Sequence, residues 1–111
     1  MDQTDLEIYQ KFVEDNSSKM VMGTGQLEIL WASSGLAAEA GEVSGVCEKA
    51  LRKSGVILPE HEDKLFDELG DVLFFLTAVC NAIDVSLDRV MEYNMSKINQ
   101  RQEEGYYAVS A

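Results

Sequence analysis

The stretch LFDELGDVLFFLTAVCNAI, from Leu65 to Ile83, decides the fold class of this chain. Its apolar residues return every three or four positions, which predicts a helix over about residues 62–82. Phe74 and Phe75 add apolar surface on other sides of this helix. Because a helix that is apolar all round must be buried all round, we expect part of its surface to meet another subunit.

Three further helices are expected on either side of this stretch. Their apolar spacing, capping residues and glycine breaks place them at residues 5 to just before 23, 26–53 and 87–102. Residues 56–60, around the single proline, are expected to form a loop. The 111 residues fit one domain, so we predict an all-α bundle of four to five helices over residues 1–111.

The charge of the chain excludes some classes of partner. Acidic residues outnumber basic ones 20 to 9, which gives a formal net charge of -11. Nucleic acids and anionic membrane surfaces would repel such a chain, so we expect neither as a partner. No apolar run approaches the ~20 residues of a membrane span, and the N-terminus does not resemble a signal peptide. We therefore expect a cytoplasmic protein.

Two short acidic segments resemble each other. Glu39 and Glu42 lie in the predicted helix 26–53, and Glu68 and Asp71 lie in the helix 62–82. Each pair has i, i+3 spacing, so both carboxylates project from one side of their helix, next to apolar residues. If the two helices pack together, four carboxylates meet at the edge of the core, where like charges repel.

A divalent cation would make this arrangement favourable. Hard oxygen ligands without sulfur favour Mg²⁺, with Mn²⁺ as a possible substitute. Helix glycines beside the acids suggest close approach by a helix or a ligand. The alternative from another class is a non-catalytic acidic helical interaction module, in which these acids form only a solvated helix face.

The few basic residues gather in two places. Candidate phosphate-binding residues follow the first acidic pair and recur on one side of the last helix: Lys49, Lys53, Asn94, Lys97 and Arg101. Trp31 lies two turns before Glu39 and could stack on a nucleobase, although a lone tryptophan is more often a core residue. A divalent ion flanked by side chains that donate hydrogen bonds to phosphate is the arrangement expected of a nucleoside triphosphate site.

These residues resemble those of the MazG-type all-α nucleotide pyrophosphohydrolases. The similarity rests on GLAAEAGE at residues 35–42, DELGDVL at 67–73 and NMSK at 94–97, with 25 residues between the two acidic pairs. Helix order also agrees, and the motif core covers about residues 26–101. The chain is similar to the short, single-domain members, which are homodimers or dimers of dimers.

The resemblance implies Mg²⁺-dependent hydrolysis of a nucleoside triphosphate to the monophosphate and pyrophosphate. The four motif acids would bind metal, and Glu39 or Glu42 would orient or deprotonate the attacking water. Lys49, Asn94, Lys97 and Arg101 would contact phosphates. House-cleaning of deoxynucleotides is the usual role of such enzymes, and a dUTPase or a phosphoribosyl-ATP pyrophosphatase activity is an alternative.

Overall fold

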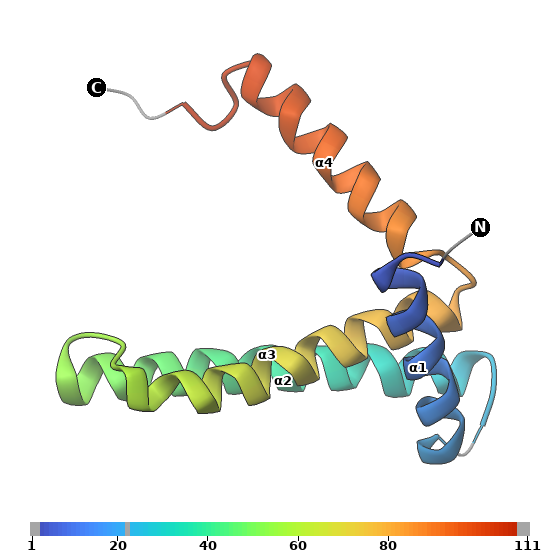
Figure 1. Ribbon diagram of the computed structural model, residues 1–111, viewed down its shortest axis with the longest axis horizontal. Coiled ribbons are helices and arrows are strands. Elements are labelled where there is room, and N and C mark those ends of the chain that lie inside the picture. The colour runs from blue at the N-terminus through green and yellow to red at the C-terminus, as the bar shows by residue number, and fades with distance from the viewer. Residues whose placement is uncertain (1–2, 22, 109–111) are drawn as a thin grey trace.

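The computed structural model describes residues 3–21 and 23–108, and this part of the chain contains four α-helices and no strand (Figure 1). The helices are α1 (Asp5–Met20), α2 (Gln26–Ser54), α3 (Pro59–Ala82) and α4 (Leu87–Glu103). The predicted all-α class is therefore confirmed.

The helix ends follow local capping chemistry. Thr4 caps α1 by accepting a hydrogen bond from the Glu7 amide at 3.1 Å, as the sequence predicts. The prediction for the start of α3 was wrong by three residues, because Pro59 occupies the first helical position, where its missing amide costs nothing. The His61 imidazole accepts a hydrogen bond from the Leu58 amide at 2.9 Å and so closes this end of the helix.

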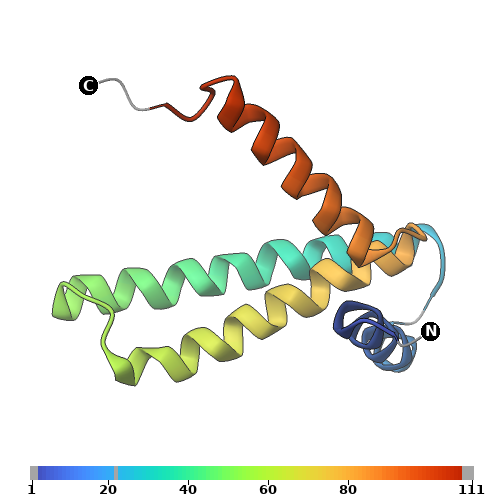
Figure 2. The same ribbon diagram turned by 45° about the horizontal axis from the view of Figure 1, so that its top comes forward.

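α2 and α3 form a long antiparallel hairpin, and α1 packs across the end where α2 begins and α3 ends (Figures 1 and 2). A cluster of buried apolar residues lies under this crossing and consists of Val13, Ala32 and Ala78. At Gly35 the two hairpin helices approach so closely that a methyl group would overlap the Phe75 ring. This glycine therefore sets the spacing between α2 and α3.

Three other glycines inside α2 and α3 do not mark close packing of helices. A methyl group added at Gly41, Gly45 or Gly70 would meet no other element of the described chain within 4 Å. Close approach by a helix is thus confirmed at Gly35 and is absent at these three positions within the described residues. A ligand near them stays a prediction.

α4 points away from the hairpin and makes its main contacts with α1 (Figure 1). The chain is accordingly open, with a radius of gyration of 17.1 Å against about 13 Å for a compact domain of this length. Among the described residues, no single helix meets the length and hydropathy criteria for a membrane span. The successive helices α3 and α4 meet them only when taken as a pair, which is bent by 105°.

Candidate active site

Three of the four predicted metal ligands meet between α2 and α3. Glu39 of α2 and Glu68 and Asp71 of α3 each offer a carboxylate oxygen, and these three oxygens lie within 4.8 Å of one another. They come together because the i, i+3 pair of α3 faces α2 across the antiparallel hairpin. Glu39 and Glu68 are partly buried, whereas Asp71 is exposed to solvent.

Glu42 stands beside this group without joining it. Burial raises the pKa of the Glu68 carboxyl above its usual 4.5, and Glu39 raises it further through a hydrogen bond and its charge. The charge of Glu42 also raises the pKa of Glu68, so the fourth acid lies close enough to act on it. The site is therefore an electrostatically unfavourable cluster of carboxylates.

The donor set fits a hard divalent cation. Carboxylate oxygens are ligands that Mg²⁺ and Mn²⁺ accept, and a site with three of them leaves positions for phosphate oxygens or water. A divalent charge would also relieve the repulsion that raises the Glu68 pKa. The chemistry of the three clustered acids thus agrees with the metal that the sequence predicts.

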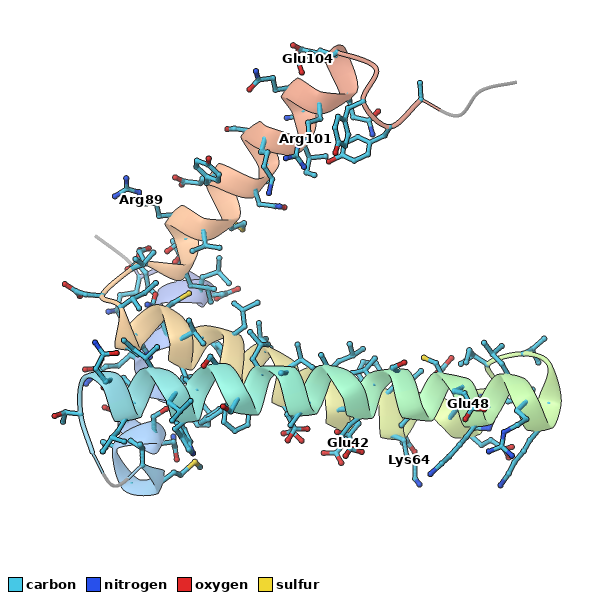
Figure 3. The ribbon with its side chains drawn as sticks, turned by 180° about the vertical axis from the view of Figure 1, so that it is seen from behind. Glu42, Glu48, Lys64, Arg89, Arg101 and Glu104 are labelled. Atoms are coloured by element: carbon cyan, nitrogen blue, oxygen red, sulfur yellow. The ribbon has the colours of Figure 1, made fainter. Side chains whose placement is uncertain are left out.

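A hollow of about 470 Å³ opens next to the acids, between the second half of α2 and the first half of α3. Its walls include Glu42 and Glu68 together with the three lysines Lys49, Lys53 and Lys64. Figure 3 shows Glu42 and Lys64 projecting from the same side of the hairpin. Within residues 3–21 and 23–108, none of the three lysines forms an ion pair. Their ammonium groups are therefore available to an anionic ligand.

Sequence reasoning found Lys49 and Lys53 but missed Lys64. The signal was present, because Lys64 lies four residues before Glu68 and so shares its face of α3. Tyr9 was also missed. Partial burial, together with the charge of Asp71, raises the pKa of the Tyr9 phenol, which places α1 near the exposed side of the acidic cluster. No local pattern connects Tyr9 with Asp71, since they lie on different helices.

The candidate phosphate residues of α4 do not reach the acids of their own chain. Asn94, Lys97 and Arg101 lie on the helix that diverges from the hairpin, and Arg101 lies near its far end (Figure 3). The Arg101 guanidinium lies 5.0 Å from the centre of the Tyr106 ring and donates to the Tyr107 hydroxyl at 3.3 Å.

Trp31 occupies a structural position. Its ring packs edge-on against Phe75 with the centroids 5.2 Å apart, and it borders the buried cluster of Val13, Ala32 and Ala78. A packing role in the core explains these contacts of Trp31 without a ligand.

Comparison with known proteins agrees with this geometry. Residues 31–106 match the family described as the MazG nucleotide pyrophosphohydrolase domain. The chain is 34% identical over 105 residues to the Gene 37 protein of Mycobacterium phage L5, with 90% of each chain covered. It also resembles the crystal structure of a Bacillus subtilis protein named "putative pyrophosphatase YPJD", with a TM-score of 0.63 and 28% identity, covering 96% of this chain and 97% of that one.

The family match spans both acidic pairs, the lysine-lined hollow and all of α4. The chain therefore belongs to the MazG nucleotide pyrophosphohydrolase family and is a nucleoside triphosphate pyrophosphatase.

Proposed function

We propose that this protein is a Mg²⁺-dependent pyrophosphohydrolase that converts deoxynucleoside triphosphates to monophosphates and pyrophosphate as a house-cleaning enzyme. One observation carries the proposal: three carboxylates gather within 4.8 Å beside a hollow that contains three lysines. A metal–triphosphate complex needs acids that bind the divalent ion and cationic side chains that bind the phosphates, and this site places the two side by side.

Each side chain has a distinct role in this proposal. Glu39, Glu68 and Asp71 would hold the metal, which when bound offsets phosphate charge and polarises the α-phosphoryl group. Glu42, beside the cluster, would orient or deprotonate the attacking water, a role for which Glu39 is the second candidate. Lys49, Lys53 and Lys64 would bind the β and γ phosphates and offset the charge that develops on the leaving pyrophosphate.

We further propose a homodimer or a dimer of dimers of this 1–111 domain. Phe66, Leu69 and Leu73 form an apolar stripe on α3 with exposures of 74%, 51% and 43%. A soluble monomer rarely exposes such a continuous surface. In an assembly of this kind, Asn94, Lys97 and Arg101 of one copy would approach the acids of another, which their own chain does not allow. The net charge of -11 supports an enzyme without nucleic-acid or anionic-membrane partners, and we propose that it acts in the cytoplasm.

The test is pyrophosphate release with Mg²⁺ across canonical and damaged ribo- and deoxynucleoside triphosphates. We expect turnover of at least one deoxynucleotide, loss of turnover with chelator, and monophosphate as the second product. Glu42→Gln and Asp71→Asn should each abolish measurable turnover, which means a loss of about 10²-fold or more. The far-UV circular dichroism of both variants should be unchanged. Asp63→Asn, an exposed aspartate on the same helix as Asp71, is the matched control and should keep full activity.

The same panel decides between the alternatives. Turnover of dUTP alone or of phosphoribosyl-ATP alone would replace the proposed substrate with a narrower one. If no triphosphate is cleaved, the non-catalytic acidic interaction module is favoured. If Glu42→Gln and Asp71→Asn both retain full activity, the assignment of these two acids to the catalytic site is wrong.

A further inference from the structure

Gln10 of α1 bonds to residues 81–87, which run from the end of α3 to the start of α4 and lie more than 70 residues further along the chain. Its side-chain nitrogen donates to Asn81 Oδ1 and to the Val85 carbonyl, both at 2.9 Å. Its side-chain oxygen accepts a hydrogen bond from the Leu87 amide at 2.8 Å. Asn81 Nδ2 returns a bond to the Gln10 carbonyl at 3.2 Å. Both amide hydrogens and the oxygen of this one glutamine are thus used.

The bond to Leu87 lies at the start of α4. Leu87 is the first residue of this helix, and its amide is one of the donors that a helix cannot satisfy internally. Ser86 Oγ caps the Arg89 amide at 3.3 Å, so the Leu87 amide depends on Gln10. The Leu87 side chain is only 6% exposed, which makes this point the anchor of α4 on the rest of the chain.

Little else fixes the direction of α4. Within the described residues its main contacts are with α1, and a second bond to that segment runs from Thr4 Oγ1 to Asp88 Oδ2 at 3.1 Å. Arg101 lies 14 residues beyond Leu87, about 21 Å along the axis. A rotation of 10° about Leu87 would therefore move Arg101 by about 4 Å.

We propose that Gln10 is a positioning residue for the triphosphate, acting through α4 rather than touching the substrate. The inference rests on the proposed function, because it assumes that Asn94, Lys97 and Arg101 bind phosphates. Without the Gln10 side chain, α4 keeps its helical structure but loses a fixed direction, so its three donors no longer meet the substrate in one geometry. Such misplacement weakens substrate binding more than it changes the chemistry at the acids on α2 and α3.

The experiment compares Gln10→Ala with Gln26→Ala, an exposed glutamine on α2. Amide hydrogen exchange at Leu87 should accelerate by about tenfold in Gln10→Ala, which is the loss of one hydrogen bond. The KM for the best triphosphate should rise about tenfold while kcat changes less than about threefold. Binding of Mn²⁺ without nucleotide should not change in either variant, and Gln26→Ala should match the wild type throughout.

Gln10→Glu is the second variant if the alanine variant does not fold. Its carboxylate cannot donate to Asn81 or Val85 and is repelled by their oxygens, which displaces the side chain from the Leu87 amide. We therefore expect faster Leu87 exchange together with a raised KM. Unchanged Leu87 exchange in a folded Gln10→Ala would overturn the proposal, as would faster exchange with an unchanged KM. A parallel loss of kcat and Mn²⁺ binding would also overturn it, since that indicates general damage.

Failure of the proposed function would look different. A wild-type protein that cleaves no triphosphate overturns the proposed function and the positioning role with it, whatever happens at Leu87. An active wild type whose KM is insensitive to Gln10 overturns the positioning role alone.

Discussion

Three acids of like charge, Glu39, Glu68 and Asp71, have carboxylate oxygens within 4.8 Å of one another. Their repulsion lowers the stability of the folded state. The cost is visible at Glu68, whose pKa is raised by burial and by the neighbouring acids. A folded-state pKa above the unfolded value means that the folded protein binds this proton more tightly. Its contribution to stability is therefore present below pH 4.5 and is lost as the pH rises through the raised pKa.

The raised pKa of Glu68 gives a prediction for the stability of the metal-free protein. In chelator, Glu68→Gln should be more stable than the wild type at pH 7 and equally stable below pH 4.5, because glutamine imitates the protonated acid. Thermal unfolding across this pH range measures the difference, with Glu92→Gln, an exposed glutamate of α4, as the control. A Glu68→Gln variant that is less stable than the wild type at pH 7 in chelator would show that the acids do not repel one another.

The sequence could predict the relative positions of site residues only where they lie on the same helix. The i, i+3 spacing predicted that each acidic pair shares a side, and the structure brings three of the four acids together. It could not predict that Glu42 stands outside the closest group, because this depends on the rotation of α2 against α3. Trp31 likewise packs against Phe75 on another helix, which no spacing within α2 reveals.

At the scale of elements, the predicted helices followed from apolar periodicity and caps. The main error, at the start of α3, came from reading Pro59 as a loop residue. Leu58 has no side-chain acceptor for the first helical amides. The His61 amide donates instead to the Leu58 carbonyl at 2.9 Å, and the His61 imidazole accepts from the Leu58 amide. The prediction of tight helix packing succeeded only at Gly35, where an aromatic ring from α3 fills the space.

The end of α3 holds the one non-glycine residue with positive φ among the described residues. Asp84 has φ 58°, and the bonds Val85 N–H to Cys80 O at 2.9 Å and Asp84 N–H to Asn81 O at 3.2 Å close the helix as a Schellman motif. Glycine is the residue that this position favours. The turn therefore keeps some backbone strain immediately before α4.

Asp84→Gly should stabilise the protein by about 0.5–1 kcal/mol, because it removes the left-handed strain of a residue with a Cβ. Urea denaturation measures the change. The matched control is Asp63→Gly inside α3, which should destabilise by up to about 1 kcal/mol because glycine disfavours a helix interior. Loss of stability in Asp84→Gly would mean that the aspartate side chain contributes more to the turn than its backbone strain costs.

At the scale of the whole molecule, the chain is too open to bury its own apolar surface. A radius of gyration of 17.1 Å and a diverging α4 leave the α3 stripe exposed. The excess apolar surface was predictable from the sequence of α3. The direction of α4 was not, because it depends on contacts such as Gln10 with Leu87, which are 77 residues apart.

The proposed assembly predicts a sedimenting species of at least twice the 12.3 kDa chain mass. Leu69→Glu, in the middle of the stripe of Phe66, Leu69 and Leu73, should shift it towards the monomer and reduce activity, because a charge there opposes burial. Val56→Glu changes an exposed apolar residue outside the stripe and should leave the mass unchanged. A wild type that sediments as a 12.3 kDa monomer at micromolar concentration would contradict the assembly.

The acids of α2 and α3 must form one divalent metal site if this chain is to hydrolyse a triphosphate as proposed. Mn²⁺ binding, followed by electron paramagnetic resonance with a non-hydrolysable deoxynucleoside triphosphate present, measures this directly. We predict at least one Mn²⁺ per chain in the wild type, displaced by Mg²⁺, with affinity at least about tenfold weaker in Asp71→Asn and unchanged in Asp63→Asn. A wild type that takes up no Mn²⁺ under these conditions, or an Asp71→Asn variant that binds it equally well, would contradict the metal site.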